Sequence, residues 1–311
     1  MAGQRSAVGQ TAAPHPPRPP DGPGDASWAP PAARAALTAA SAATLDRLLR
    51  PLRRRRPRQP RRLATALAPL SARVSLRTWS EWTGVRPGAV QGDLVLHCGE
   101  SLRGRYCATL VAVDVATSWT ELQALYDLHH QRVTGGIQHL APRLPFPLRE
   151  WHSDNGSEFI NTCLLGWCQR RGIHTRGRPY RKNDQAWVEQ RNGLLGRRLV
   201  GYDRYSARAA CTVLQRLYDL LRLQHNFFRP VRKLLHKHRI GSRVHKQYDA
   251  AQTPYQRVLA AAALPADRQQ ALAAQWVALD PIALARDIHQ ALDVLWKLAD
   301  TRSPRQEAAR G

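Results

Sequence analysis

The chain contains the nonapeptide Trp151-His152-Ser153-Asp154-Asn155-Gly156-Ser157-Glu158-Phe159. The residues just before Asp154, from Leu148 to Ser153, are predicted to form a short strand. Asn155-Gly156 is a strong turn signal, and the apolar spacing from Ser157 to Arg171 predicts a helix. This order would place Asp154 at the carboxyl end of a strand, where the ligand sites of open α/β sheets gather.

Three short β-like runs precede the nonapeptide. They cover Asp93–His97, Tyr106–Val115 and Trp119–Leu125, and short loops containing glycine or serine join them. The second run is apolar at nearly every position, which predicts a strand buried on both faces. A helix is predicted near Thr134–Leu140. The resulting order β-β-β-α-β-α predicts an α/β fold with a mixed sheet that begins as an antiparallel meander and is flanked by helices.

The rest of the chain after the nonapeptide is mainly helical in pattern. The apolar spacing predicts helices at Asn183–Val200, Ser206–Asn226, Ala266–Leu279 and Ile282–Ala299. Ser206 is the expected N-cap of the second helix, and Asp280-Pro281 supplies an N-cap and a first-turn Pro for the last one. A basic segment, Lys233–Lys246, lies between the second and third helices.

The N-terminal region differs in composition. Residues 1–35 are rich in Pro, Ala and Gly with almost no large apolar side chains, so they are predicted to be disordered. A helix is predicted at Ser41–Leu52, and the cationic strip Arg53, Arg54, Arg55 and Arg56 follows it. A solvated linker would explain this strip, but the charge of the whole chain favours contact with a DNA backbone.

The composition indicates a polyanionic partner. The 311 residues include 47 Lys plus Arg against 23 Asp plus Glu, a formal net charge of +24. Nucleic acid is the leading candidate, because no apolar run long enough to span a membrane and no apolar signal segment are present. The five cysteines are an odd number without C-x-x-C spacing, which predicts neither a disulfide framework nor a zinc site.

Three separated acids in this basic chain could hold divalent metal against phosphate. Asp93 lies on a predicted strand, Asp154 follows another, and Glu189 lies on a predicted helix. Phosphoryl transfer can use two Mg²⁺ ions, and three carboxylates suffice for two ions if one of them bridges. Glu158 falls in the first turn of its predicted helix, where stabilisation of the helix dipole is the preferred interpretation over metal ligation.

The surroundings of the three acids resemble the DDE integrase/transposase superfamily, in particular bacterial insertion-sequence transposases with an integrase-type catalytic core. The matching segments are Gly92-Asp93, Asp114, the nonapeptide, and Arg178-Pro179-Tyr180-Arg181-Lys182-Asn183-Asp184-Gln185-Ala186-Trp187-Val188-Glu189-Gln190-Arg191-Asn192. This resemblance implies an RNase H-like fold, dependence on Mg²⁺ or Mn²⁺ with two ions bound, and catalysis and metal binding by Asp93, Asp154 and Glu189. It also implies a homo-oligomer, because two DNA ends are handled together.

Several neighbours of the three acids receive a separate interpretation. Asp114 lies outside the three-acid set and is interpreted as structural or supporting, and His97 and His152 as core or rim histidines. The loop before Glu189 is basic, and we expect it to contact a DNA strand rather than to be merely solvated. The loop residues in this expectation are Arg178, Arg181, Lys182 and Asn183.

These features predict four regions. They are a disordered arm (1–35), a helical and Arg-rich DNA-binding linker (36–77), an integrase-type catalytic core (78–230), and a basic, helical C-terminal region (231–311). The expected activity is DNA transposition or integration through end cleavage and strand transfer, with element ends and target DNA as partners, in the bacterial cytoplasm at the nucleoid and without membrane association. Two alternatives stay open: an inactive, truncated transposase remnant that binds DNA without catalysis, and an RNase H-like nuclease.

Overall fold

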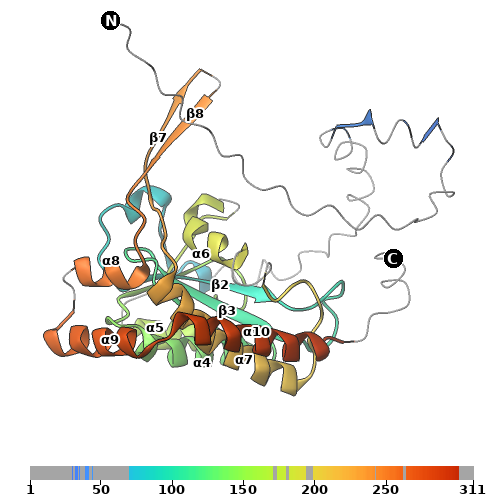
Figure 1. Ribbon diagram of the computed structural model, residues 1–311. Coiled ribbons are helices and arrows are strands. Elements are labelled where there is room, and N and C mark those ends of the chain that lie inside the picture. The colour runs from blue at the N-terminus through green and yellow to red at the C-terminus, as the bar shows by residue number, and fades with distance from the viewer. Residues whose placement is uncertain are drawn as a thin grey trace, which may run out of the picture. The chain divides into compact units, whose positions relative to one another are not determined.

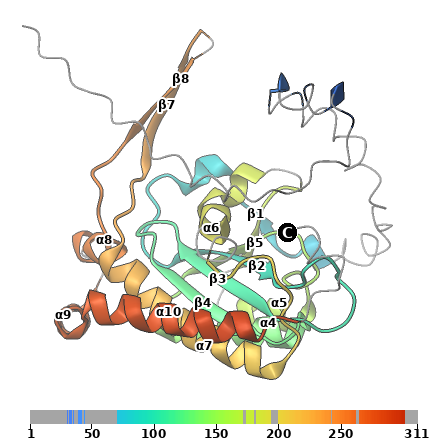
Figure 2. The same ribbon diagram turned by 45° about the vertical axis from the view of Figure 1, so that its right-hand side comes forward.

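A six-stranded mixed sheet forms the centre of the computed structural model of the chain (Figures 1 and 2). The structure describes residues 70–300 except 171–173, 180–181, 194–198, 242 and 262–263, together with isolated positions between 30 and 44. The described residues from Leu70 to Asp300 belong to one unit, Arg61–Thr301. The predicted disordered arm, nearly all of the predicted helix Ser41–Leu52 and the strip Arg53–Arg56 lie outside the described residues.

The first three long strands form the predicted antiparallel meander. They are β2 (Ala89–Leu96), β3 (Ala108–Asp114) and β4 (Thr120–Leu125), and Asp93 pairs with Val111 across β2 and β3. β2 begins earlier than predicted because its first residues pair on their other side with a parallel strand. The meander confirms the sequence-based order of elements in this region.

The remaining strands of the sheet are parallel. β5 (Glu150–Ser153) pairs with β2, β6 (His174–Arg176) pairs with β5, and β1 (Ser75–Leu76) pairs with β6, so the order is β1-β6-β5-β2-β3-β4. β1 and β6 were not predicted, since two or three residues are too few to show a period. Three antiparallel strands followed by parallel ones, with helices on both faces, form the mixed sheet predicted for an RNase H-like fold.

A glycine allows β5 to lie close to β2. A Cβ atom at Gly92 would lie 2.0 Å from Cζ2 of the buried Trp151 side chain. Only glycine therefore leaves room for the indole at this point. This close approach fixes β5, and the acid that follows it, beside Asp93.

Helices cover both faces of the sheet (Figure 2). On one face α4 (His130–Leu140) and α5 (Thr162–Gln169) pack over Leu110 and Ala112. On the other face Val111 and Val113 pack in a second core cluster with residues of α7 (Arg208–Leu223) and α10 (Pro281–Lys297). β3 is thus buried on both sides, as its apolar run predicts, and burial of each such side chain contributes about 1.5–3 kcal/mol.

Two predicted helix starts are wrong. Residues 157–160 form turns, and α5 begins only at Thr162, where the Asn161 side chain accepts a hydrogen bond from the Leu164 N–H at 2.9 Å. An Asn cap therefore replaces the predicted start at Ser157. Ser206 is not the N-cap of α7, because its backbone N–H and hydroxyl donate to the Asp300 carboxylate instead.

The predicted helix Asn183–Val200 is divided. A 3₁₀ turn, η4 (Lys182–Gln185), precedes α6 (Ala186–Arg191), and residues 194–198 lie outside the described part. At the far end of α7, the chain continues as a π-helical turn, η6 (Gln224–Phe228), so the predicted end near Asn226 is close to the observed one. In both places the backbone hydrogen bonds differ from those of an α-helix. The spacing of apolar residues does not reveal such a difference.

The C-terminal region contains a separate two-stranded hairpin and three helices. The basic segment, to which the sequence assigned no element, forms β7 (Leu234–Ile240) and β8 (Arg243–Tyr248), which extend away from the sheet (Figure 1). α8 (Pro254–Ala260) was not predicted, whereas α9 (Ala266–Ala278) and α10 were, and the Asp280 side chain caps α10 as expected.

The last features of the fold to consider are the cysteines and the length of the helices. All five cysteines are free thiols in this structure. No helix in the described part of the chain has the combination of length and apolar composition needed to cross a bilayer.

Candidate active site

Asp93 lies near the middle of β2, and its side chain is half-buried. Oδ1 accepts the Leu94 backbone N–H at 2.8 Å, and Oδ2 accepts the Asn192 Nδ2–H at 2.6 Å. Asn192 is the C-cap of α6, so this bond ties the helix that carries Glu189 to the strand that carries Asp93. In the sequence Asn192 is only one residue of a longer motif, and only the fold shows its contact with Asp93.

Asp154 follows β5 directly, in a turn that its own carboxylate stabilises. Oδ1 accepts the Gly156 N–H at 2.9 Å. A Cβ atom at Gly156 would lie 2.6 Å from Glu158 Oε2 and 3.0 Å from Asp154 Oδ1, so glycine is required here by space. The predicted Asn155-Gly156 turn is confirmed, and it directs Glu158 back toward Asp154 rather than into the first turn of α5.

The electrostatics of Asp154 reflect this turn. Although Asp154 reaches solvent, the protein atoms packed around its carboxyl group raise its pKa, and the Gly156 N–H opposes the rise. The nearby Glu158 carboxylate raises the pKa further. Glu158, interpreted from the sequence as helix stabilisation, is therefore an electrostatic neighbour of Asp154.

Glu189 is exposed on α6, and the buried Val188 beside it anchors the helix in the core. α6 packs against β2 and β3. Glu189 and Asn192 are three residues apart, so they lie on the same face of the helix. The face that directs Asn192 to Asp93 therefore also presents Glu189 toward β2.

Asp154 and Glu189 both lie within electrostatic range of Asp93. Burial, the largest cause, and the negative charges of Asp154 and Glu189 together raise the pKa of Asp93 to about 6, against the Leu94 and Asn192 hydrogen bonds. Asp93 therefore lies among like charges, which disfavour its ionised form.

The acids do not close around one point. Among the described residues, no group of three His, Cys, Asp or Glu side chains is arranged to hold one metal ion. The carboxylate set itself suits Mg²⁺ or Mn²⁺, which prefer oxygen ligands, and like charges without a cation repel one another. For Asp93 Oδ2 to bind a cation, its Asn192 hydrogen bond must be shared or broken.

Asp114 lies apart from this group, at the end of β3. Its carboxylate accepts the Gly88 N–H at 2.8 Å and two bonds from Thr117, at 2.8 and 2.7 Å, and it is fully buried. Burial raises its pKa to about 6, while these bonds and the Lys233 charge oppose the rise. These contacts agree with the structural interpretation of Asp114.

The two flanking histidines are buried, as interpreted from the sequence. Burial lowers the pKa of both His97 and His152 to about 4. His97 Nε2 lies 2.6 Å from Thr109 Oγ1, and His152 Nδ1 lies 3.0 Å from Thr175 Oγ1. Both rings are therefore neutral near pH 7.

The predicted DNA-contacting residues are described only in part. Arg178 forms an ion pair with the buried Asp184, with Nε and Oδ2 2.9 Å apart, and 43% of its side chain is exposed. Much of its donor capacity is thus used within the protein. Arg181 and the strip Arg53–Arg56 lie outside the described residues, and only the backbone positions of Lys182 and Asn183, in η4, are described.

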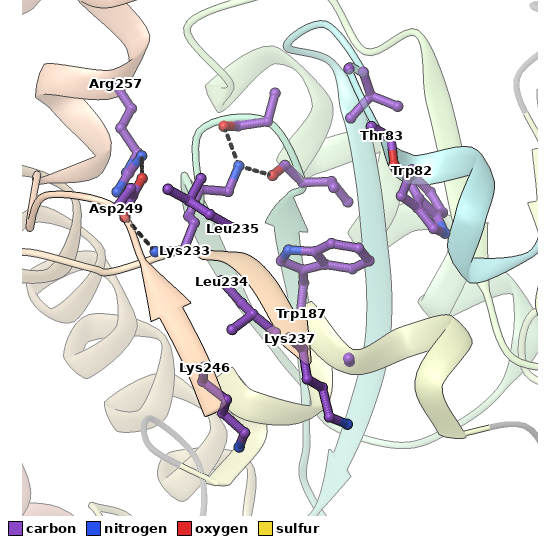
Figure 3. Close-up of a pocket in the computed structure, with 15 residues that line it drawn as sticks. Trp82, Thr83, Trp187, Lys233, Leu234, Leu235, Lys237, Lys246, Asp249 and Arg257 are labelled. Carbon is purple, nitrogen blue, oxygen red and sulfur yellow. Dashed lines mark hydrogen bonds and ion pairs between the residues drawn. The ribbon is translucent and has the colours of Figure 1, made fainter. Parts of the chain in front are cut away.

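A cleft that the sequence did not predict lies at the base of the hairpin (Figure 3). Its volume is about 820 Å³. Residues of η2 (Trp79–Trp82) and the loop after it, the end of β3, the start of α6 and the hairpin base line it; among them are Trp82, Val115, Trp187, Lys233, Lys237 and Lys246. Two features of the sequence could have indicated this cleft, namely the basic segment Lys233–Lys246 and Trp187. The sequence alone does not show that they lie close together in the fold.

Comparison with known proteins gives relatives but no named family. No family model matches the chain. It is 43% identical over 185 residues to the uncharacterized protein y4rM of Sinorhizobium fredii, an alignment that covers 59% of this chain and 53% of that protein. The chain thus spans about half the length of the curated relative that it matches.

Two solved structures resemble parts of the chain. The catalytic core domain of BIV integrase aligns with a TM-score of 0.39 and 23% identity, over 56% of this chain and 95% of that one. The simian T-cell lymphotropic virus intasome in complex with the PP2A regulatory subunit B56 gamma aligns with a TM-score of 0.38 and 18% identity, over 51% of this chain and 53% of that one.

Proposed function

We propose that the chain catalyses metal-dependent phosphoryl transfer on DNA, by cleaving the ends of a mobile element and joining them to a target. The observation that carries this proposal is the electrostatic neighbourhood of Asp93, in which a half-buried carboxyl group lies among two further acids from different elements. Three acids near one another in a chain of net charge +24 are unfavourable without a cation and suited to phosphate with one.

Each residue has a role that follows from its position. Asp93, Asp154 and Glu189 would hold Mg²⁺ or Mn²⁺; two such ions, when bound, activate the attacking oxygen and neutralise charge on the leaving oxygen. Asn192 positions Asp93 through the Oδ2 hydrogen bond and keeps α6 beside β2. The Gly156 N–H holds Asp154 at the end of β5. The basic loop before Glu189 and the strip Arg53–Arg56 would contact the DNA backbone. Such contacts position the DNA strand but do not specify its sequence.

The test is a cleavage and joining assay on element-end DNA with Mg²⁺. We expect Asp154→Asn to lose both products, because one ligand of the metal site is removed. Asp293→Asn is the matched control: it removes the same charge from an exposed position of α10, and we expect wild-type activity. Undiminished cleavage and joining by Asp154→Asn would refute the proposal.

A binding function without catalysis is the second candidate. The observation that favours it is that the described acids form no group arranged around one metal ion. A DNA-binding remnant would show salt-sensitive binding, from the release of counterions, but no metal-dependent product. A third candidate, an RNase H-like nuclease, would give metal-dependent cuts without joined strands, so product analysis separates it from a transposase.

The partners follow from the same proposal. Element ends and target DNA are the expected ligands, and a homo-oligomer is expected because two ends must be joined together. An assay that captures a second labelled DNA end on an immobilised first end tests this directly. We further propose a cytoplasmic, nucleoid-associated protein; loss of its co-sedimentation with the nucleoid after DNase treatment is the expected result.

A further inference from the structure

The hairpin carries an unneutralised pair of charges beside the cleft. Lys237 and Lys246 are direct cross-strand partners, both exposed, and neither forms an ion pair with another described residue. Like charges directly opposite each other destabilise an antiparallel pair. Residues 231–248 contain no Asp or Glu that could offset them. An anion between the two ammonium groups would remove this repulsion.

An aromatic surface faces the same cleft. Trp187, at the start of α6, is half-buried, and its ring centroid lies 5.9 Å from that of Trp82. Trp82 is only 4% exposed and packs edge-on against His152. Figure 3 shows the Trp187 indole between the hairpin residues Leu234 and Leu235 and the Trp82 side chain. Trp187 is therefore the ring that a flat ligand in the cleft would meet.

The combination of aromatic and cationic groups limits the class of ligand. Proteins bind unpaired nucleic acid strands with a positively charged groove for the backbone and aromatic side chains on which bases stack. The cleft, with a volume of about 820 Å³, has room for a short piece of a single strand rather than for a duplex. Its remaining polar wall is internally paired, since Lys233 Nζ donates to the Val115 and Ala116 carbonyls and Arg257 pairs with Asp249.

We infer that this cleft binds an unpaired strand of DNA, with a phosphate between Lys237 and Lys246 and a base stacked on Trp187. The inference rests on the proposed function in taking DNA as the partner, and it specifies the form of that DNA.

The cleft lies near the start of β2, the strand that carries Asp93, so one continuous strand of DNA could run from the cleft toward the acids. Val115 lines the cleft, and its N–H donates to Ala89 at the start of β2. The step from Ala89 to Asp93 corresponds to about 13 Å along a strand. Trp187 and Glu189 lie on the same short helix. A DNA strand bound in the cleft can therefore extend along the start of β2 toward Asp93.

Binding of a fluorescein-labelled oligothymidylate in EDTA, followed by anisotropy over a salt series, tests the lysine pair. We expect Lys237→Gln with Lys246→Gln to weaken binding at least tenfold and to reduce the slope of log affinity against log salt by about 1.4. The matched control is Arg286→Gln with Lys297→Gln, which removes the same charge from exposed positions of α10. An equal loss in both double variants would overturn the inference.

A second measurement tests the stacked base. Fluorescence of 2-aminopurine in an oligonucleotide should be quenched by the wild type and by Trp187→Phe but not by Trp187→Ala, which should also bind about tenfold more weakly. The lysine variants change exposed side chains only, so they remain informative if Trp187→Ala unfolds. Unchanged quenching by a folded Trp187→Ala protein, or an equal loss of duplex and single-strand binding in the lysine variant, would contradict the inference.

These experiments separate this inference from the proposed function. Binding is measured in EDTA, so a protein that fails to join DNA can still show the cleft-dependent binding. Conversely, joining that depends on Asp154 but is independent of Lys237, Lys246 and Trp187 would leave the function standing and refute the cleft.

Discussion

Asp114 and Asp93 lie in neighbouring strands of the same sheet, and burial raises the pKa of each to about 6. Their partners differ. Asp114 accepts bonds from one backbone N–H of Gly88 and from the N–H and hydroxyl of Thr117, with the Lys233 charge nearby. Asp93 accepts two bonds and faces two other carboxylates.

A raised pKa does not by itself mark a reactive carboxyl group, as these two residues show. Both carboxyl groups lose solvation, but the protein satisfies Asp114 and leaves Asp93 among like charges. Asp114 therefore holds the corner between β2, β3 and the hairpin base, while Asp93 has an electrostatic environment that a cation would complete.

The largest expected effect is on activity. Asp93→Asn should reduce DNA joining with Mg²⁺ by at least about 10³-fold, equivalent to about 4 kcal/mol of transition-state stabilisation. Asp114→Asn, assayed at a temperature where it is folded, should retain joining within about tenfold. Initial rates of product formation give both values. Equal losses in the two variants would remove the distinction between the two carboxylates.

The second expected effect is on stability, and here Asp114→Asn should lose more than Asp93→Asn. Asp114→Asn should lower the free energy of unfolding by about 2–4 kcal/mol, because the amide presents a donor where three donors already converge. Asp93→Asn should cause no such loss, since it removes a repelled charge. Urea denaturation followed by circular dichroism measures both, with Asp293→Asn as the control. A stable Asp114→Asn protein would contradict the structural role.

The third effect depends on pH. The pKa of Asp93 is raised to about 6 in the folded protein, from 3.8 for a free side chain, so ionisation of Asp93 destabilises the fold as pH rises through this window. Asp93→Asn should therefore be more stable than wild type above pH 6, by on the order of 1–3 kcal/mol, and equal to it below about pH 4.

The measurement for this third prediction is the difference between the two unfolding midpoints at each pH. The difference is needed because buried histidines change the wild-type curve in the opposite direction: the pKa of His97, His152 and His174 is lowered to about 4, so their contribution to stability grows as pH rises. If Asp93→Asn were still more stable than the wild type at pH 3.5, the ionisation of Asp93 would not be the cause.

The smallest effect concerns Glu158. Its carboxylate raises the pKa of Asp154, so Glu158→Gln should lower that pKa and shift the acidic limb of the pH profile of joining to lower pH. The rate at neutral pH should change by less than about tenfold, because the proposed metal-binding set of Asp93, Asp154 and Glu189 does not include Glu158. A loss as large as that of Asp154→Asn would instead make Glu158 a ligand.

Several features could be predicted from the sequence. The apolar run of β3 specified a strand buried on both faces, and Asn155-Gly156 specified the turn after β5. Asp280-Pro281 specified the start of α10. These signals are local: they depend on residues adjacent in the chain, so neither packing nor distant partners can remove them.

Other features depended on distant partners. The sequence could not reveal β1 and β6, whose two or three residues are strands only because neighbours hydrogen-bond to them. Ser206 has the residue type of an N-cap, but the Asp300 carboxylate takes its hydroxyl. The α5 start moved to Asn161 because the turn after Asp154 uses residues 157–160.

The sequence alone predicted the antiparallel meander, the strand before Asp154 and the large positive charge, because composition and local periodicity carry this information, and its motifs singled out Asp93, Asp154 and Glu189 as the candidate acids. Only the tertiary structure decided that Asn192 holds Asp93, that Glu158 faces Asp154, and that Lys237, Lys246 and Trp187 share one cleft. Asn192 is far from Asp93 in the chain, and Trp187 is far from the two lysines, so the register of β2 against its neighbours and the packing of α6 and the hairpin base set their distances. Glu158 is close to Asp154 in the chain, but only the conformation of the turn at Gly156 brings their carboxylates together.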